Sequence, residues 1–263
     1  MRNLVYPIKV NNLSWYFGES KVLKNISTSI EENKFTCIIG PNGSGKSTFL
    51  RNILKLLEPK KKSIYVYNED IVKLRYKDLA KKIASVPQNT MVDFDFTVMD
   101  IVLMGRSPHL RRFEAESKKD FEIAEKAMKI TNIWHLKDRG INRISGGERQ
   151  RAIIARALAQ ESDILILDEP ISHLDIHHQI DVLNIAKELC DKKNLTVIAV
   201  LHDLNFAIQY SDYLILFHEG KIVAEGLPEK VITQENIKHV YNIDVYMMKN
   251  PLNGKPHIIP IVR

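Results

Sequence analysis

A glycine-rich stretch limits the possible folds of this chain more than any other part of it: Gly40-Pro41-Asn42-Gly43-Ser44-Gly45-Lys46-Ser47-Thr48. These residues fit the pattern G-x-x-x-x-G-K-[ST]. The mostly apolar residues 35–39 predict a buried parallel strand before it, and apolar residues at helical spacing over 46–57 predict a helix after it. The pattern binds phosphate in this context, so we expect a bound nucleoside triphosphate rather than an ordinary turn.

The chemistry of this phosphate loop (40–48) gives its parts separate roles. Successive backbone N–H groups and a helix N-terminus attract anions, so every residue from Gly40 to Thr48 is a candidate phosphate contact. Lys46 is expected to reach the β- and γ-phosphates, and the Ser47 hydroxyl is expected to ligate Mg²⁺.

A second apolar strand is predicted over 164–167, and it ends in two adjacent carboxylates, Asp168 and Glu169. The carboxyl end of a parallel strand opens toward the ligand crevice. Asp168 is placed to hold Mg²⁺, and Glu169 is placed to polarise an attacking water as a general base. Such a strand end is as often only a pair of solvated carboxylates, but beside a phosphate loop it indicates hydrolysis.

A third motif, residues 144–150, precedes a predicted helix. Ser145 and Glu148 have the spacing of a capping box, so Ser145 is the expected N-cap. Gly146 and Gly147 at the same helix start would let a phosphate approach the backbone N–H groups. Taken alone, the motif fits a well-capped helix equally well.

Composition indicates a globular protein that stays in the cytosol. The 263 residues are 44% hydrophobic, yet no apolar run approaches the roughly 20 residues that a membrane span needs, and residues 1–7 carry no signal-peptide stretch. Cys37 and Cys190 suggest neither a disulfide framework nor a metal cluster, and Cys37 reads as a core residue. The net charge of +6 comes with basic clusters at 60–62, 111–112 and 118–119, which we interpret as solvated faces. Attraction to nucleic acid or to the anionic cytoplasmic leaflet is the alternative, and no nucleic-acid-binding motif accompanies the clusters.

The rest of the chain reads as one α/β unit interrupted by a helical insert. A crossover helix over 179–189 fits between strands at 164–167 and 197–201. The other expected elements, in chain order, are two strands within 4–34 around a turn at 18–20, a strand at 63–67, helix-like sequence to about 83, helices over 100–160, and short strands over 212–263 with turns at 219–220 and 253–254. One helical face is predicted from Phe121, Ala124, Ala127, Met128 and Ile130.

These motifs resemble those of the ATP-binding subunits of ABC transporters, over nearly the whole chain. Residues 40–48 match the Walker A loop and residues 164–169 match Walker B. Residues 144–148 match the ABC signature, where Ile144 and Glu148 replace the leucine and glutamine of its commonest form. The resemblance implies that Ser145, Gly146, Gly147 and Glu148 contact nucleotide.

Four further positions match by order and spacing. Gln88 matches the Q-loop glutamine, and the resemblance gives it a catalytic and metal-binding role. His202 matches the switch histidine and is a catalytic candidate. Residues 172–175 match the D-loop, which makes Asp175 a nucleotide-site candidate. Phe17 matches the aromatic residue that stacks on adenine, with Tyr16 as its neighbouring candidate.

The resemblance also implies an architecture and a mechanism. The expected fold is a RecA-like P-loop core with an N-terminal antiparallel β subdomain and a helical subdomain. All 263 residues form one nucleotide-binding domain, with 1–88 and 161–263 as core and about 89–160 as the helical part. Two copies, or one copy and a relative, would close around ATP and Mg²⁺, with each signature facing the γ-phosphate held by the other copy. The dimer would sit on the inner membrane face against a polytopic permease, served by an extracytoplasmic solute-binding protein.

Sequence after the Q-loop resembles one importer subfamily, which carries ferric siderophores, haem and vitamin B12. The similar stretches are 96–110, 173–176, 244–246 and 254–260. An iron chelate is the expected cargo, and haem, cobalamin, zinc or manganese are the alternatives. His173 lies in the D-loop match, and His177 and His178 are adjacent and lack i,i+4 geometry with each other, so none is expected to bind metal.

Two other classes were weighed. A soluble ABC protein that acts on ribosomes or DNA usually carries two nucleotide-binding halves or a long coiled-coil insertion, and this sequence shows neither. A small-molecule kinase would have no use for the signature at 144–148. Nucleic acid is therefore not an expected partner.

Overall fold

The computed structural model describes residues 6–88 and 95–261, and the chain divides into two compact units. The first unit takes in the chain up to Leu74 and from Asn194 onward, and the second runs from Arg75 to Lys193. These bounds differ from the sequence-based division at 88/89 and 160/161, which follows the family's subdomains and stays a prediction. The first residues of that predicted helical part, 89–94, lie outside the described residues.

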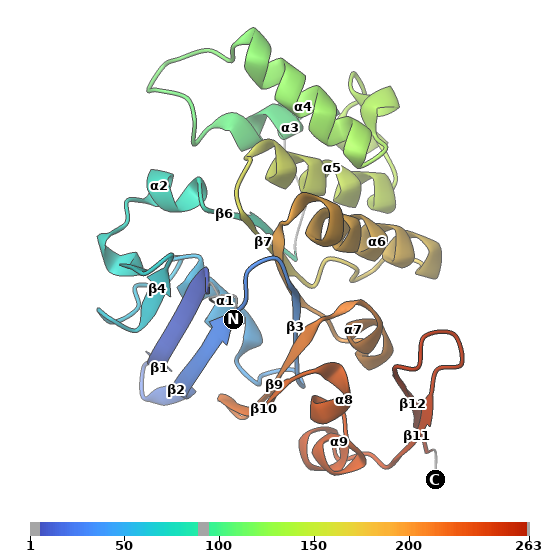
Figure 1. The fold of residues 1–263 in the computed structure, drawn as a ribbon. Coiled ribbons are helices and arrows are strands. Elements are labelled where there is room, and N and C mark those ends of the chain that lie inside the picture. The colour runs from blue at the N-terminus through green and yellow to red at the C-terminus, as the bar shows by residue number, and fades with distance from the viewer. Residues whose placement is uncertain (1–5, 89–94, 262–263) are drawn as a thin grey trace. The chain divides into compact units, whose positions relative to one another are not determined.

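The first unit opens with an antiparallel sheet of order β2-β1-β4-β5 (Figure 1). Its long hairpin pairs β1 (Ile8–Phe17) with β2 (Ser20–Ile30) around the predicted turn at Gly18, and β1 also pairs with β4 (Ile64–Val66), beyond which lies β5 (Glu69–Asp70). Ile8, Val10 and Leu13 of β1 are buried on the face that covers the core, and the spacing changes at a register shift between Val10 and Leu13. Residues 4 and 5 of the predicted strand region lie outside the description.

A parallel core makes up the middle of the first unit. β3 (Phe35–Ile39) lies between β8 (Thr196–Val200) and β9 (Tyr213–His218), parallel to both, and β10 (Lys221–Gly226) pairs antiparallel with β9. Every residue of β3 and β8 is buried, Cys37 among them, as expected of central parallel strands. The chain leaves β3 through the phosphate loop into α1 (Lys46–Ile53), which ends four residues before the predicted helix end at 57.

The last part of the first unit contains helices that the sequence analysis missed. α7 (Leu204–Tyr210) follows β8, and α8 (Pro228–Val231) and α9 (Gln234–Tyr241) follow β10. A hairpin of β11 (Val245–Lys249) and β12 (Pro256–Pro260) then forms around the predicted turn at 253–254. The predicted short strands and both turns are therefore confirmed, whereas the helices between them are additions.

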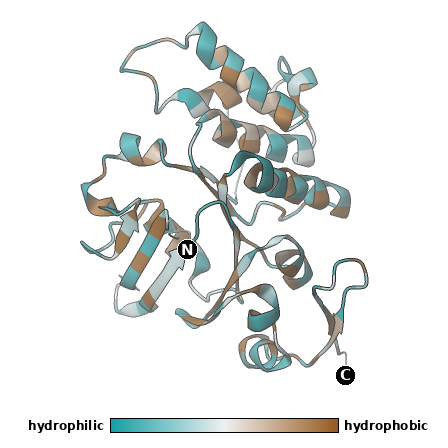
Figure 2. Cartoon of the chain, viewed as in Figure 1, coloured by the Kyte–Doolittle hydropathy of each residue, from teal (hydrophilic) through white to brown (hydrophobic). Residues whose placement is uncertain are grey.

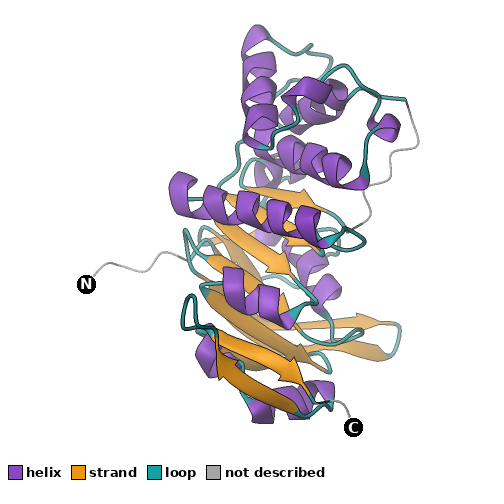
Figure 3. Cartoon of the chain, turned by 90° about the vertical axis from the view of Figure 1, so that its right-hand side faces the viewer, coloured by secondary structure: helices purple, strands orange, loops and turns teal. Residues whose placement is uncertain are grey.

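The second unit is mostly helical, as the purple ribbons of Figure 3 show. Two parallel strands, β6 (Ile83–Val86) and β7 (Ile164–Asp168), carry its catalytic candidates. The helices are α2 (Tyr76–Ala80), α3 (Val98–Leu103), α4 (Lys118–Ile130), α5 (Gly146–Ala159) and α6 (Ile176–Lys193). α5 packs against both α3 and α4, and α6 spans the predicted crossover helix.

One local prediction is confirmed only in part, and another is wrong. The helix-like sequence before residue 83 forms only a 3₁₀ turn (71–73) and α2, because Asp70 accepts a hydrogen bond from the Val72 N–H and Leu74 is extended. Phe121 was placed on the buried face of α4 but is 45% exposed. The buried stripe of α4 is centred on Asp120 and Ala124, so Phe121 lies at its edge. In Figure 2, hydrophobic (brown) and hydrophilic (teal) residues alternate along the helices.

Candidate nucleotide-binding and hydrolysis site

The phosphate loop follows β3 in a conformation that only glycine adopts easily. Gly40 has φ +149° and Gly45 has φ +106°. A Cβ atom on Gly40 would lie 2.3 Å from the carbonyl oxygen of Phe217, so a side chain does not fit there. Gly43, at φ +78°, has open space on its outer side. The glycines therefore shape the loop and leave its outer rim (Pro41, Asn42, Gly43) accessible to a ligand.

The start of α1 fits an anion. No described side chain caps α1, whereas α4, α5, α7 and α9 each begin at a side chain that accepts a backbone N–H. The first N–H groups of α1 are therefore left for another acceptor. The buried Ser44 hydroxyl also has no hydrogen-bond partner within the described residues. A phosphate group would satisfy these donors.

Lys46 lies inside the loop that it was predicted to serve. Its side chain is 5% exposed, and its Nζ donates to the carbonyl oxygens of Gly40 at 2.8 Å and Pro41 at 3.0 Å. The ammonium is thus held next to the glycine turns by two hydrogen bonds that a charged phosphate could replace. Ser47 and Thr48 are half-buried in the first turn of α1. A serine hydroxyl is an oxygen ligand that Mg²⁺ accepts, so Ser47 fits as a donor to that ion. The metal-binding roles of Asp168 and Gln88, which belong to the second unit, stay predictions.

Two other candidates of the first unit have exposed positions. Phe17, at the end of β1, is 48% exposed and packs edge-on against Trp15, with ring centroids 6.2 Å apart. Tyr16 is equally exposed, and Lys21 Nζ lies 5.5 Å from its ring centre. His202 is exposed two residues after β8. Adenine stacking on Phe17 and catalysis by His202 stay predictions.

The second unit brings Gln88 and Glu169 together. Gln88 follows β6 and Glu169 follows β7, and Gln88 Nε2 donates to Glu169 Oε2 at 2.6 Å. The Ser172 hydroxyl lies 3.0 Å from the Glu169 carbonyl oxygen and 3.3 Å from its Oε2. The Glu169 carboxylate, next in sequence to Asp168, therefore accepts from the Gln88 amide and the Ser172 hydroxyl. The role of Ser172 was missed, although a serine three residues after a turn residue is a known local hydrogen-bonding pattern.

The signature at 144–148 has the predicted capping box. Glu148 accepts from the Ser145 N–H at 2.8 Å, and Ser145 Oγ accepts from the Glu148 N–H at 3.3 Å. These hydrogen bonds from Ser145 lower the pKa of Glu148, so the carboxylate that closes the box is ionised at neutral pH. Gly146 and Gly147 form the first turn of α5. Glu148 thus supports the turn in place of the family's glutamine.

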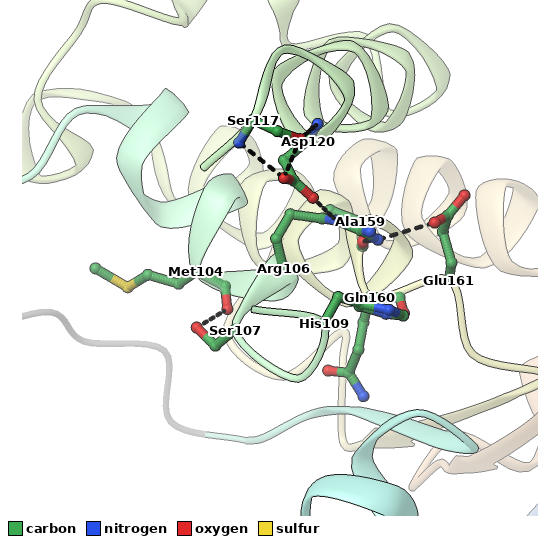
Figure 4. Close-up of polar contacts among 9 residues, drawn as sticks. All are labelled: Met104, Arg106, Ser107, His109, Ser117, Asp120, Ala159, Gln160 and Glu161. Atoms are coloured by element: carbon green, nitrogen blue, oxygen red, sulfur yellow. Dashed lines mark hydrogen bonds and ion pairs between the residues drawn. The ribbon is translucent and has the colours of Figure 1, made fainter. Parts of the chain in front are cut away.

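The subfamily stretch 104–109 closes the opposite end of α5, and its partners were not predicted (Figure 4). Arg106 is 4% exposed; its Nη1 donates to the carbonyl oxygen of Ala159 at 2.6 Å and pairs with Glu161 at 2.9 Å. Its Nε donates to Asp120 at 2.9 Å, and His109 Nε2 lies 2.8 Å from the carbonyl oxygen of Gln160. The guanidinium therefore caps the carboxyl end of the helix that starts at the signature.

Comparison with known proteins agrees with the motifs. The family model for the ABC transporter matches residues 23–172, more than half of the chain. The chain belongs to the ABC transporter family. As such a cassette it binds ATP and is an ATPase, and its fold is the expected P-loop α/β fold with an antiparallel β part and helical segments. No helix in the described part of the chain is long and apolar enough to cross a membrane.

Individual relatives match over their full length. The chain is 41% identical to the ferric enterobactin transport ATP-binding protein FepC of Escherichia coli (strain K12), over 100% of this chain and 97% of FepC. A solved metal-chelate type ABC transporter, in an inward-facing conformation, matches with a TM-score of 0.87 at 29% identity, over 99% of this chain and 98% of that one. The dimeric bacterial ABC transporter cassette MJ0796 matches with a TM-score of 0.73 at 30% identity, over 84% and 98%.

Proposed function

We propose that this chain is the ATP-hydrolysing subunit of an importer for an iron chelate of the ferric siderophore class. The observation that carries the proposal is the 41% identity to the ferric enterobactin relative along both full lengths. The metal-chelate type transporter supports the same class of cargo. The phosphate loop with the uncapped start of α1, and Glu169 with its partners Gln88 and Ser172, supply the ATPase chemistry that such an importer needs.

In this proposal ATP binds with its phosphates on the loop at 40–48. Lys46 exchanges the carbonyl oxygens of Gly40 and Pro41 for the β- and γ-phosphates, and the N–H groups of the loop and α1 hold the remaining charge. Ser47, Asp168 and Gln88 would hold Mg²⁺, which neutralises phosphate charge when bound. Phe17 would stack on adenine.

Hydrolysis is assigned to Glu169. Its carboxylate orients a water and accepts a proton as the water attacks the γ-phosphorus, while the bond from that phosphorus to the bridging oxygen breaks and ADP leaves with the oxygen. His202 assists at the same phosphate. Gln88 and Ser172 hold one carboxylate oxygen of Glu169 in place, at 2.6 and 3.3 Å.

Closure requires a second copy. The signature residues Ser145, Gly146 and Gly147 of one copy, with its Asp175, would contact the ATP held by the other, and dimeric MJ0796 supports this arrangement. ATP then stabilises the closed dimer through contacts that the open state lacks. We place the dimer on the inner face of the membrane against a polytopic permease, with a solute-binding protein on the outer side.

Uptake by cells tests the cargo. Cells that lack this chain should fail to accumulate a radioactive ferric siderophore, the wild-type chain should restore uptake, and the Glu169→Gln chain should not. Haem and cobalamin are measured in the same cells. Restored uptake of one of those instead of the ferric siderophore would move the assignment to that cargo, and no difference in any uptake would overturn the importer proposal.

A further inference from the structure

We propose that His178 is a positioning residue that ties the D-loop (172–175) to the signature turn, so that the two act as one rigid edge when a second copy closes on ATP. The inference rests on the proposed dimeric site, since only closure gives this edge a ligand. His178 lies in the first turn of α6 and matches none of the nucleotide motifs.

The first contact joins His178 to the D-loop. Its backbone N–H donates to Asp175 Oδ1 at 3.0 Å, and its ring Nδ1 lies 2.9 and 2.8 Å from the two Asp175 oxygens. These hydrogen bonds lower the pKa of Asp175, so its carboxylate is charged and attracts the ring. His178 therefore contacts both carboxylate oxygens of Asp175, the last residue of the D-loop.

The second contact joins the same ring to the signature. A Cβ atom on Gly147 would lie 2.1 Å from His178 Cδ2 and 2.6 Å from Cγ, so the imidazole occupies the space of the missing side chain. Gly146, by contrast, would meet only a Leu174 methyl group at 3.9 Å. The His178 ring is therefore packed on the backbone of Gly147, and its position fixes where that peptide can lie.

The neighbouring residue braces the D-loop backbone. Gln179 Nε2 donates to the carbonyl oxygens of Leu174 at 2.9 Å and Ile171 at 3.4 Å. The first turn of α6 therefore holds the D-loop by side chain and by backbone, and the other end of the loop reaches Glu169 through Ser172. The His178 ring carries this support across to Gly147 at the start of α5.

His177 provides a matched control. It is adjacent in sequence and of the same type, but its side chain is 79% exposed and its Nε2 lies 3.6 Å from Asp181. The His178 side chain is 28% exposed. No group of three or more His, Cys, Asp or Glu side chains in the described chain could hold a metal ion, so a shared metal does not explain the pair.

The test measures three properties of the 263-residue chain. They are ATP affinity of the monomer, ATP-driven dimerisation in a Glu169→Gln background, and the turnover number in the native background. His178→Ala should weaken dimerisation roughly tenfold and lower turnover severalfold, because one charge-assisted hydrogen bond and one packing contact are lost. Monomer affinity for ATP should stay within twofold, and His177→Ala should match the parent in all three.

Two conservative variants separate the contacts. His178→Asn keeps a nitrogen donor for Asp175 but no ring over Gly147, and His178→Phe keeps the ring but no donor. Each should recover part of the loss. A His178→Ala chain that dimerises and turns over like the parent would overturn the inference, as would equal losses in monomer ATP binding. If the Glu169→Gln parent itself fails to dimerise with ATP, the proposed composite site is wrong instead.

Discussion

Replacing Asp120 by asparagine removes one charge from the cluster around Arg106 and changes the size of the side chain very little (Figure 4). Asp120 Oδ2 accepts from the Ser117 hydroxyl at 2.6 Å and from the Ser117 N–H at 2.9 Å, while Oδ1 accepts from Arg106. An amide offers one acceptor and one NH₂ group. The variant must therefore turn an NH₂ group toward one of these two sets of donors.

The size of the effect follows from the pKa of Asp120. Hydrogen bonds from Ser117, and then from Arg106, lower the pKa of this carboxyl from 3.8 to about 2. At 1.36 kcal/mol per pKa unit, the charged form contributes about 2 kcal/mol to the free energy of unfolding at pH 7. Asp120→Asn also removes a negative charge that pairs with the buried Arg106 guanidinium. We therefore expect the free energy of unfolding to fall by about 2–4 kcal/mol in total.

The sign of the pH dependence is fixed by the lowered pKa. The contribution is complete well above pH 3.8 and is lost as the pH falls through about 2, with about 1 kcal/mol gone by pH 3. Urea unfolding at pH 7, 4 and 3 should show the wild-type and Asp120→Asn chains converging as the pH falls. Glu161→Gln is the control, because Glu161 pairs with the same Arg106 but has a 53% exposed side chain, and it should cost less than about 1 kcal/mol. Equal losses for the two variants, or a difference that does not shrink with pH, would refute this reasoning.

The remaining predictions concern the nucleotide motifs. Lys46→Ala should lower the rate of ATP hydrolysis at least about 100-fold, because it removes the ammonium that lies against the glycine turns. Normal turnover in a radiolabelled phosphate-release assay would show that residues 40–48 are not the phosphate-binding loop. Gly147→Ala should cost about 1–3 kcal/mol of unfolding free energy in the native chain, because the new Cβ collides with the His178 ring. In a His178→Ala background the same change should be neutral or slightly stabilising, since alanine favours helix over glycine; equal losses in both backgrounds by thermal unfolding would show that the two residues are not in contact.

The parts of the site that the sequence revealed are those encoded in short local patterns. The phosphate loop, the Ser145/Glu148 box and the strand before Asp168 each depend on neighbours within about five residues, and the structure has the predicted local form at each. The short helices α8 and α9 were missed, although Pro228 at the first position of α8 and Thr233 as the N-cap of α9 were available signals.

Contacts between distant segments could not be predicted in this way. Arg106 meets Asp120, Ala159 and Glu161 only because the packing of α4 and α5 brings these segments together. In the same way the ring of His178 reaches Gly147 across 31 positions of sequence. A pattern in one segment carries no information about which segment will lie against it, so these partners needed the fold.

One purification tests whether this ATPase works on a membrane transporter. Tagged Glu169→Gln chain is mixed with ATP and detergent-solubilised membranes of its own organism and then recovered by its tag. We expect a polytopic membrane protein to be recovered with it, and we expect the Lys46→Ala chain to recover less of that protein. Recovery of ribosomes or nucleic acid alone, or of the chain with no membrane protein, would contradict the account.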